Sequence, residues 1–223
     1  MIETEVILFG ERMGLIEKNL KPDSRFTPAK DLLVFQLIDS SLDHFVFRKP
    51  LSFYDNPGIE VAMFGMGCFW GVERLFWGLE GVVMTAVGYS AGTSDSPDYN
   101  LVCSKVVDHS EVVLVHFQPE KISFSELLAL FWESHDPTQG MRQGNDIGVQ
   151  YRSGIYAFSE EQYKVAFETK DHYSSILKRA KFLPITTEIL PANKFYYAEE
   201  YHQQYLAKNP RGYCALKGTG INF

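Results

Sequence analysis

The chain has 223 residues with 45% hydrophobic content, a net charge of −7 and a pI near 5.4, so it is long enough to bury a full core. No cluster of Lys and Arg predicts a nucleic-acid surface, and no apolar stretch is long enough to span a bilayer or form a signal peptide. We therefore expect a globular, cytoplasmic monomer without nucleic-acid or membrane partners.

Residues 1–58 form an N-terminal extension of unclear structure. Apolar pieces at residues 6–9 and 32–35 are separated by polar and proline-containing segments, which predicts short strands or an irregular wrap. Turn-forming residues at 54–58 divide this extension from a main domain of residues 59–223. We expect the glycine-bearing C-terminal tail of that domain to be mobile.

The main domain begins with a strand, a tight turn and a helix in direct succession. Residues 59–64 predict a buried strand and residues 65–67 a turn, and apolar residues at helical spacing then follow Cys68. After these, we expect strands at 82–89 and 110–117, a helix capped by Ser123 and Glu126, a polar loop at 136–153, a strand at 149–157, a capped helix at 159–179, a strand at 186–190 and a last helix at 197–207.

The order of these elements predicts the fold class. The strands are separated by helices, but they are short and half-polar, which is less typical of a doubly wound parallel sheet than of a two-layer sandwich. We therefore expect an α/β (α+β) protein with a mixed or antiparallel sheet and flanking helices.

Cys68 is the strongest candidate for a reactive residue. It directly follows Gly-x-Gly where a strand turns into a helix, so free backbone N–H groups and the helix dipole favour its thiolate. Phe69 and Trp70 come next and predict a wall for a small apolar group such as a methyl. The alternatives are a buried filler thiol and ordinary core aromatics.

The other two cysteines differ in their surroundings. Cys214 lies in the glycine-bearing tail, where a thiol could swing to meet another thiol. Cys103 has apolar neighbours, which favours a structural role. An odd number of cysteines argues for thiols kept reduced in the cell, and neither the cysteines nor the histidines have metal-ligand spacing, so we expect no metal.

The sequence resembles the A class of the peptide methionine sulfoxide reductases over about residues 59–218. The segments that carry the resemblance occur in the same order as in that family. They are Gly67-Cys68-Phe69-Trp70-Gly71, Val87-Gly88-Tyr89, Val102-Cys103-Ser104, His109-Ser110-Glu111-Val112, residues 131–139, Gly144-Asn145-Asp146, Gln150-Tyr151-Arg152-Ser153 and residues 201–206.

The resemblance implies a ferredoxin-like sandwich whose pocket takes free or peptide-bound methionine-S-sulfoxide. It implies that Cys68 is the nucleophile, that Glu111 is the acid near the sulfoxide oxygen and that Cys214 resolves the oxidised nucleophile. The remaining site residues that it implies are Phe69 and Trp70 around the substrate methyl, Tyr99 and Tyr151 as hydrogen-bond donors to the oxygen, and Asp146 in the supporting polar network.

The chemistry explains these residue types. A sulfoxide oxygen is a poor leaving group unless it is protonated, and a carboxyl group shielded from water, such as Glu111, keeps a proton near neutral pH. Oxygen transfer leaves Cys68 as a sulfenic acid, which condenses with a second thiol to a disulfide. An external dithiol, with thioredoxin as the natural candidate, then reopens it, and no bound cofactor is needed.

The tail departs from the family pattern in two ways. Many members have a second recycling cysteine, but residues 220–223 contain none, so the reductant is expected to attack the disulfide between Cys68 and Cys214 directly. Ala215-Leu216-Lys217 replaces a more glycine-rich segment, which predicts a stiffer tail.

Two other functions remain open from the residues alone. A cysteine hydrolase would need a histidine base, for which His109, His135 and His202 are available. A non-catalytic reader of oxidised methionine, or a redox sensor, would keep the pocket without turnover. The combination of Cys68, Glu111 and Cys214 favours the reductase.

Overall fold

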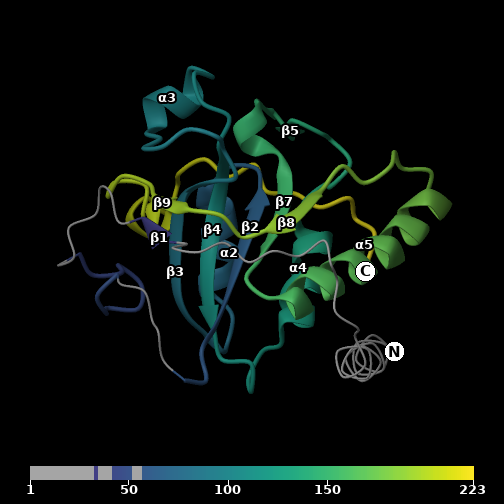
Figure 1. The fold of residues 1–223 in the computed structure, drawn as a ribbon, viewed down its shortest axis with the longest axis horizontal. Coiled ribbons are helices and arrows are strands. Elements are labelled where there is room, and N and C mark those ends of the chain that lie inside the picture. Colours follow the sequence, from purple (N-terminus) through teal and green to yellow (C-terminus); the bar gives the residue numbers. More distant parts are fainter. Residues whose placement is uncertain (1–32, 35–41, 52–56) are drawn as a thin grey trace.

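The computed structural model describes residues 33–34, 42–51 and 57–223, which form one mixed sheet with helices packed on it (Figure 1). The strands of the main sheet are β1 (Leu33–Val34), β2 (Glu60–Met66), β3 (Val82–Ser90), β4 (Ser110–Phe117), β7 (Ser153–Ala157), β8 (Glu188–Pro191) and β9 (Phe195–Tyr197). The helices are α2 (Phe69–Trp77), α3 (Tyr99–Cys103), α4 (Phe124–Ser134), α5 (Glu160–Arg179), α6 (Tyr205–Lys208) and the 3₁₀ helix η1 (Val149–Tyr151).

The sheet has the order β1-β9-β3-β4-β2-β7-β8. The central strands β3, β4, β2 and β7 pair antiparallel, whereas β1 with β9 and β7 with β8 pair parallel. The predicted α/β class with a mixed sheet is confirmed. The longer elements follow the β-α-β-β-α-β order that the term ferredoxin-like describes, in the sequence β2, α2, β3, β4, α4 and β7. The short α3, a two-stranded hairpin and η1 interrupt this order, and the label stays a prediction.

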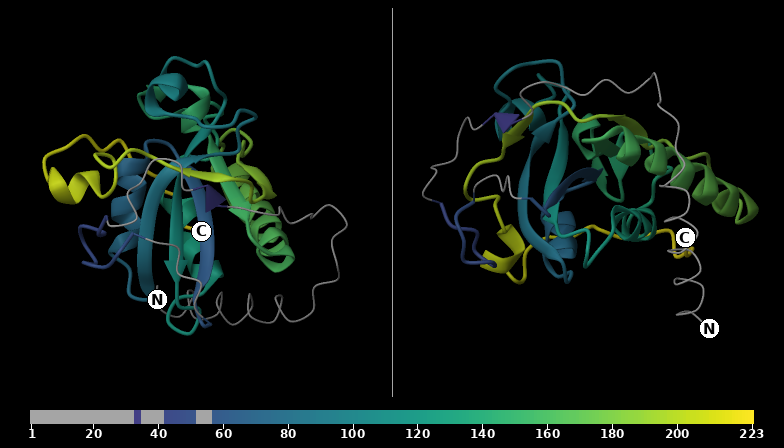
Figure 2. Two further views of the ribbon diagram at one scale, coloured as in Figure 1. Left: turned by 60° about the vertical axis from the view of Figure 1, so that its left-hand side comes forward. Right: turned by 60° about the horizontal axis from the view of Figure 1, so that its bottom comes forward.

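The alternation of side chains along β2 explains why the sheet has two different faces. Phe64 points into the larger apolar cluster with residues of α2, α4 and α5, and Met63 points into a smaller cluster on the other face. Leu51 closes that second face as part of the segment 42–51. The helices therefore cover one face of the sheet. Figure 2 shows strands β2, β3 and β4 running side by side.

Several predicted elements match the structure closely. Strand β4 has the predicted bounds, and the Ser123 hydroxyl accepts from the Glu126 N–H in a complete capping box at the start of α4. Helix α5 begins after its cap at Ser159 and ends at Arg179, as predicted. These elements are specified by local side-chain chemistry and by apolar periodicity.

Two predicted elements were wrong. The helix predicted at 197–207 is mostly a series of turns, and only α6 is helical, because the Gln203 side chain bonds to backbone atoms of Val87 and Ala198 and Gln204 adopts a left-handed conformation with a φ of 48°. The strand predicted at 149–157 begins only at β7, since η1 occupies its first part. Helix α3, capped by Asp98, was not predicted.

The N-terminal predictions are tested only in part. The apolar piece at 6–9 lies outside the described residues, and the piece at 32–35 contributes β1. In the described segment 42–51, the buried His44 ring bonds to Thr85 on β3. The division into residues 1–58 and 59–223 stays a prediction.

Gly88 on β3 allows β9 to approach closely, and we predict that Gly88→Ala destabilises the fold. An added Cβ would overlap the backbone oxygen of Tyr196 and the ring of Phe195. Overpacking of this kind costs about 1–3 kcal/mol of the free energy of unfolding, measurable by urea denaturation. Gly78→Ala is the control, because the nearest atoms to its Cβ lie at 3.8 Å. Equal denaturation midpoints for the two variants would contradict this prediction.

Candidate active site

Cys68 lies between the end of β2 and the first residue of α2, at the N-cap position. The turn requires glycine at position 67, because its φ is +90° and an added Cβ would lie 2.6 Å from the Gln143 side chain. The thiol is half-buried, and its side chain makes no capping hydrogen bond to the first turn of α2. The predicted strand-turn-helix setting of this cysteine is therefore present.

Glu111 on β4 reaches the same helix terminus from the sheet. Its carboxyl oxygen accepts from the backbone N–H of Phe69 at 3.1 Å, which satisfies a donor that the first turn of α2 leaves free. Glu111 is only 2% exposed. The candidate acid and the candidate nucleophile are thus held at one point, where the helix meets the sheet.

A cavity of about 200 Å³ opens above this point. It brings together all of the predicted site residues except Cys214, and adds one tyrosine that was not predicted. Its lining residues are Cys68, Phe69, Trp70, Tyr99, Glu111, Asp146, Tyr151 and Tyr213. In Figure 1, α3 and the hairpin of β5 (Arg142–Gln143) and β6 (Asp146–Ile147) lie at the same end of the sheet.

Burial controls the protonation of the two central groups. It raises the pKa of Glu111 to about 8, with a smaller contribution from the charge of Asp146, so the carboxyl is mostly protonated at neutral pH. Burial, followed by the charges of Glu111 and Asp146, also raises the pKa of Cys68 well above the ordinary thiol value. These effects oppose the expected resting thiolate, because they act against the stabilisation by the helix N-terminus.

The tyrosines supply neutral donors around the cavity. Burial raises the pKa of both Tyr99 and Tyr151, so both hydroxyls keep their protons over the physiological range. The Tyr213 hydroxyl donates to Asp146 Oδ1 at 3.1 Å. Asp146 Oδ2 is buried without a hydrogen-bond partner among the described residues. The cavity lining therefore combines apolar rings with hydrogen-bonding groups.

Cys214 lies on the outer surface of α2, one helical turn from Cys68. Its sulfur accepts from the Arg74 guanidinium at 3.2 Å, and a Cβ added to Gly71 would lie only 2.8 Å from it. All three cysteines are free thiols. Cys103 does not line the cavity, and its structural role stays a prediction.

Three contributors were missed from the sequence. Tyr213 lines the cavity directly, and only its position next to Cys214 could have suggested it. Arg152 bonds to the backbone oxygens of Asp108, Val149 and Ala91 and thereby ties together loops that flank Tyr151. His202 accepts from the Trp70 indole. These last two act through partners that are distant in sequence.

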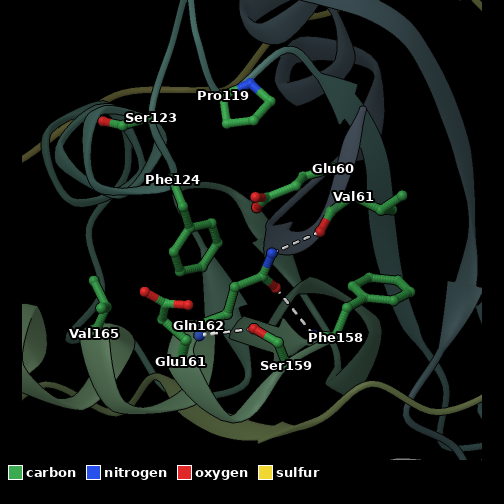
Figure 3. Close-up of a pocket in the computed structure, with 10 residues that line it drawn as sticks. All are labelled: Glu60, Val61, Pro119, Ser123, Phe124, Phe158, Ser159, Glu161, Gln162 and Val165. Carbon is green, nitrogen blue, oxygen red and sulfur yellow. Dashed lines mark hydrogen bonds between the residues drawn. The ribbon is translucent and has the colours of Figure 1, made fainter. Parts of the chain in front are cut away.

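A larger cavity, of about 430 Å³, lies at the opposite end of β2 (Figure 3). It is lined by Phe124, Phe158 and the carboxylates of Glu60 and Glu161, and the Gln162 amide in its wall already bonds to Val61 O and Phe158 N. It contains no thiol and no histidine. The smaller cavity is therefore the candidate active site.

The histidines do not support a cysteine hydrolase. Neither His109, His135 nor His202 lines the cavity with Cys68. The His135 ring bonds to Phe131 O and the Ser153 hydroxyl. Within the described part of the chain, no group of His, Cys, Asp and Glu side chains is arranged to hold a metal ion.

Comparisons with known proteins identify the family. The family model described as peptide methionine sulfoxide reductase matches residues 60–221. The chain belongs to this family. MsrA 1 of a Synechocystis strain is 51% identical over 96% of this chain and 92% of its own length, and MsrA of Rippkaea orientalis is 58% identical over 80% and 82%. The reductase is thus an oxidoreductase of the MsrA class.

Solved structures of the same class share the fold. Methionine sulfoxide reductase A of Corynebacterium diphtheriae has a TM-score of 0.71 and 42% identity, over 81% of this chain and 89% of that one. Reduced Mxr1 from Saccharomyces cerevisiae has a TM-score of 0.68 and 37% identity, over 74% and 96%. Among the described residues of the reductase, no helix has the length and apolar character to cross a membrane.

The raised pKa of Cys68 predicts slow alkylation at neutral pH. We expect its reaction with iodoacetamide to accelerate steadily up to pH 10 without a plateau, measured by peptide mass spectrometry. Glu111→Gln removes the nearby negative charge and should accelerate the reaction at every alkaline pH. Glu161→Gln, at the larger cavity, is the control and should leave the rate unchanged. A plateau of the wild-type rate near pH 7 would contradict the protonated thiol.

Proposed function

We propose that the protein reduces free or peptide-bound methionine-S-sulfoxide through a sulfenic acid on Cys68. The observation that carries this proposal is the single cavity that joins a thiol, a protonated carboxyl and two adjacent aromatic side chains. A methyl sulfoxide has an apolar end and a polar oxygen, which matches these two kinds of wall. Residues 59–223 would then be the catalytic domain, with residues 1–58 as an extension and a mobile tail.

The first step transfers one oxygen atom and two electrons. The sulfur of Cys68 attacks the sulfoxide sulfur while Glu111 gives its proton to the oxygen, so that the oxygen does not leave as a strong base. The hydroxyl then passes from the substrate sulfur to the Cys68 sulfur as the bond between the two sulfurs breaks, which leaves a sulfenic acid on Cys68 and releases the thioether product. The proton of the Cys68 thiol replaces the one that Glu111 gave, so no net proton is consumed.

The polar side of the cavity assists this step. Tyr99 and Tyr151 donate to the sulfoxide oxygen, and Asp146 supports the polar network through Tyr213. Phe69 and Trp70 hold the methyl group. Loss of one donor to a developing oxyanion commonly costs about 3 kcal/mol, or about a hundredfold in rate.

The second stage restores the thiol. Cys214 attacks the sulfenic acid, a disulfide forms and water leaves. An external dithiol then exchanges with this disulfide, and both cysteines return as thiols while the reductant is oxidised. The position of Cys214 one helical turn from Cys68 supports this assignment. For the related Mxr1, a structure in complex with Trx2 has been solved, which supports a thioredoxin as the reductant here.

Cys68→Ser should abolish reduction of methionine-S-sulfoxide with dithiothreitol as reductant. The serine hydroxyl cannot accept an oxygen atom, so we expect a loss of more than about a thousandfold, measured as methionine formed. The R epimer serves as the specificity control and should not be reduced by the wild type. A Cys68→Ser variant that retains activity would refute the mechanism, and a wild type inactive on both epimers would refute the function.

Gly71→Ala and Cys214→Ser should both stop thioredoxin-driven cycling but leave one stoichiometric turnover. The added methyl would displace the Cys214 sulfur from α2, and the serine removes the resolving thiol altogether. Product formed per enzyme, with and without thioredoxin, is the measurement. Cys103→Ser is the control and should cycle normally. Unimpaired cycling of Cys214→Ser would reassign the resolving role.

A further inference from the structure

The indole of Trp70 is held on two sides, by His202 in the segment between β9 and α6 and by Tyr205 at the start of α6. Its N–H donates to His202 Nδ1 at 3.0 Å, and its ring stacks on Tyr205 with centroids 3.9 Å apart and planes at 18°. Trp70 itself is half-buried and lines the cavity. The orientation of the Trp70 ring is therefore fixed by His202 and Tyr205 as well as by α2.

The same imidazole contacts two further walls of the cavity. The His202 ring lies 5.1 Å from the Phe69 ring and 4.7 Å from the Tyr99 ring, measured between centroids. His202 is only 1% exposed and does not line the cavity. One buried ring thus supports three cavity-lining side chains without reaching the substrate, which is the position of a residue that acts through others.

The protonation of His202 suits this contact. Burial lowers its pKa to about 4, so the ring is neutral at physiological pH. Because Nδ1 accepts from the indole, the ring proton resides on Nε2, which faces the Glu199 carboxylate at 3.9 Å. Glu199 in turn accepts from the Tyr89 hydroxyl and from the Tyr99 N–H, both at 2.9 Å.

The two residues after His202 anchor it to the sheet and to α2. The Gln203 amide bonds to both backbone groups of Val87 on β3. The backbone N–H and the amide of Gln204 both donate to the buried Glu73 carboxyl on α2, at 2.8 and 2.7 Å. His202 is therefore fixed relative to both elements that border the cavity, and it has little freedom to follow a displaced Trp70.

We propose that His202 is a positioning residue that sets the width of the methyl seat through Trp70 and thereby the preference of the enzyme for a methyl sulfoxide over a larger alkyl sulfoxide. This inference rests on the proposed function. A pocket distinguishes substrates that differ by one methylene by a factor of about 10–200, provided that its walls are rigid. Without the hydrogen bond between Trp70 and His202, the pocket for the methyl group would also accept the additional carbon of an ethyl sulfoxide.

The test compares methionine-S-sulfoxide with ethionine-S-sulfoxide as substrates of His202→Phe, which keeps a ring but removes the acceptor. We expect the ratio of kcat/KM for methyl over ethyl to fall about tenfold, mainly through a lower KM of the ethyl substrate. His202→Asn places an amide oxygen near the position of Nδ1 and should restore the ratio to within about twofold of the wild type. His172→Phe, on the exposed side of α5, is the matched control.

A spectroscopic arm tests the contact itself. In protein with ¹⁵N-labelled tryptophan, the Trp70 indole N–H signal, assigned with Trp70→Phe, should move upfield in His202→Phe and return in His202→Asn. The signals of Trp77 and Trp132 are internal references. In the Trp70→Phe background, His202→Phe should change the substrate ratio no further, because the donor is already gone.

The outcomes separate this inference from the proposed function. A wild type that reduces neither sulfoxide overturns the proposed function and the inference with it. An active wild type together with an unchanged methyl-to-ethyl ratio in folded His202→Phe overturns the inference alone. An unshifted Trp70 indole signal in that variant would do the same.

Discussion

The hydrogen bond from the Phe69 N–H to Glu111 joins the start of α2 to the centre of the sheet, and the rest of the site depends on it. It satisfies a backbone donor of the helix, and it fixes the carboxyl directly beside Cys68. The bond also lowers the pKa of Glu111, yet burial dominates and leaves the value at about 8. A buried acid is therefore kept neutral and close to the group that must lose a proton.

This arrangement changes the expected state of the nucleophile. A helix N-terminus alone would favour the thiolate of Cys68. Burial of the site and the negative charges of Glu111 and Asp146 instead favour the protonated thiol. The Cys68 thiol and the Glu111 carboxyl thus both carry a proton before the reaction. Their exchange during oxygen transfer explains how a protonated thiol can serve as the nucleophile without a separate base, which agrees with the absence of a histidine from the cavity lining.

The site was predictable from sequence where local chemistry specifies it. The turn glycine before Cys68, the aromatic pair after it, the capping box of α4 and the Ser159 N-cap of α5 all lie in short segments. The chain between β9 and α6 was not predictable as turns, because Gln203 and Gln204 look helical in sequence and find their partners on β3 and α2. The protonation of Cys68 depends in the same way on Glu111 of β4, which is distant in the chain.

The most direct test of this account is an infrared titration of the Glu111 carboxyl, taken as the difference between the wild type and Glu111→Gln. The account predicts a band of the protonated acid that is present at pH 7 and disappears with a midpoint near 8. A midpoint near the ordinary value of 4.5 would contradict it, because Glu111 would then carry no proton to give to the sulfoxide oxygen at neutral pH.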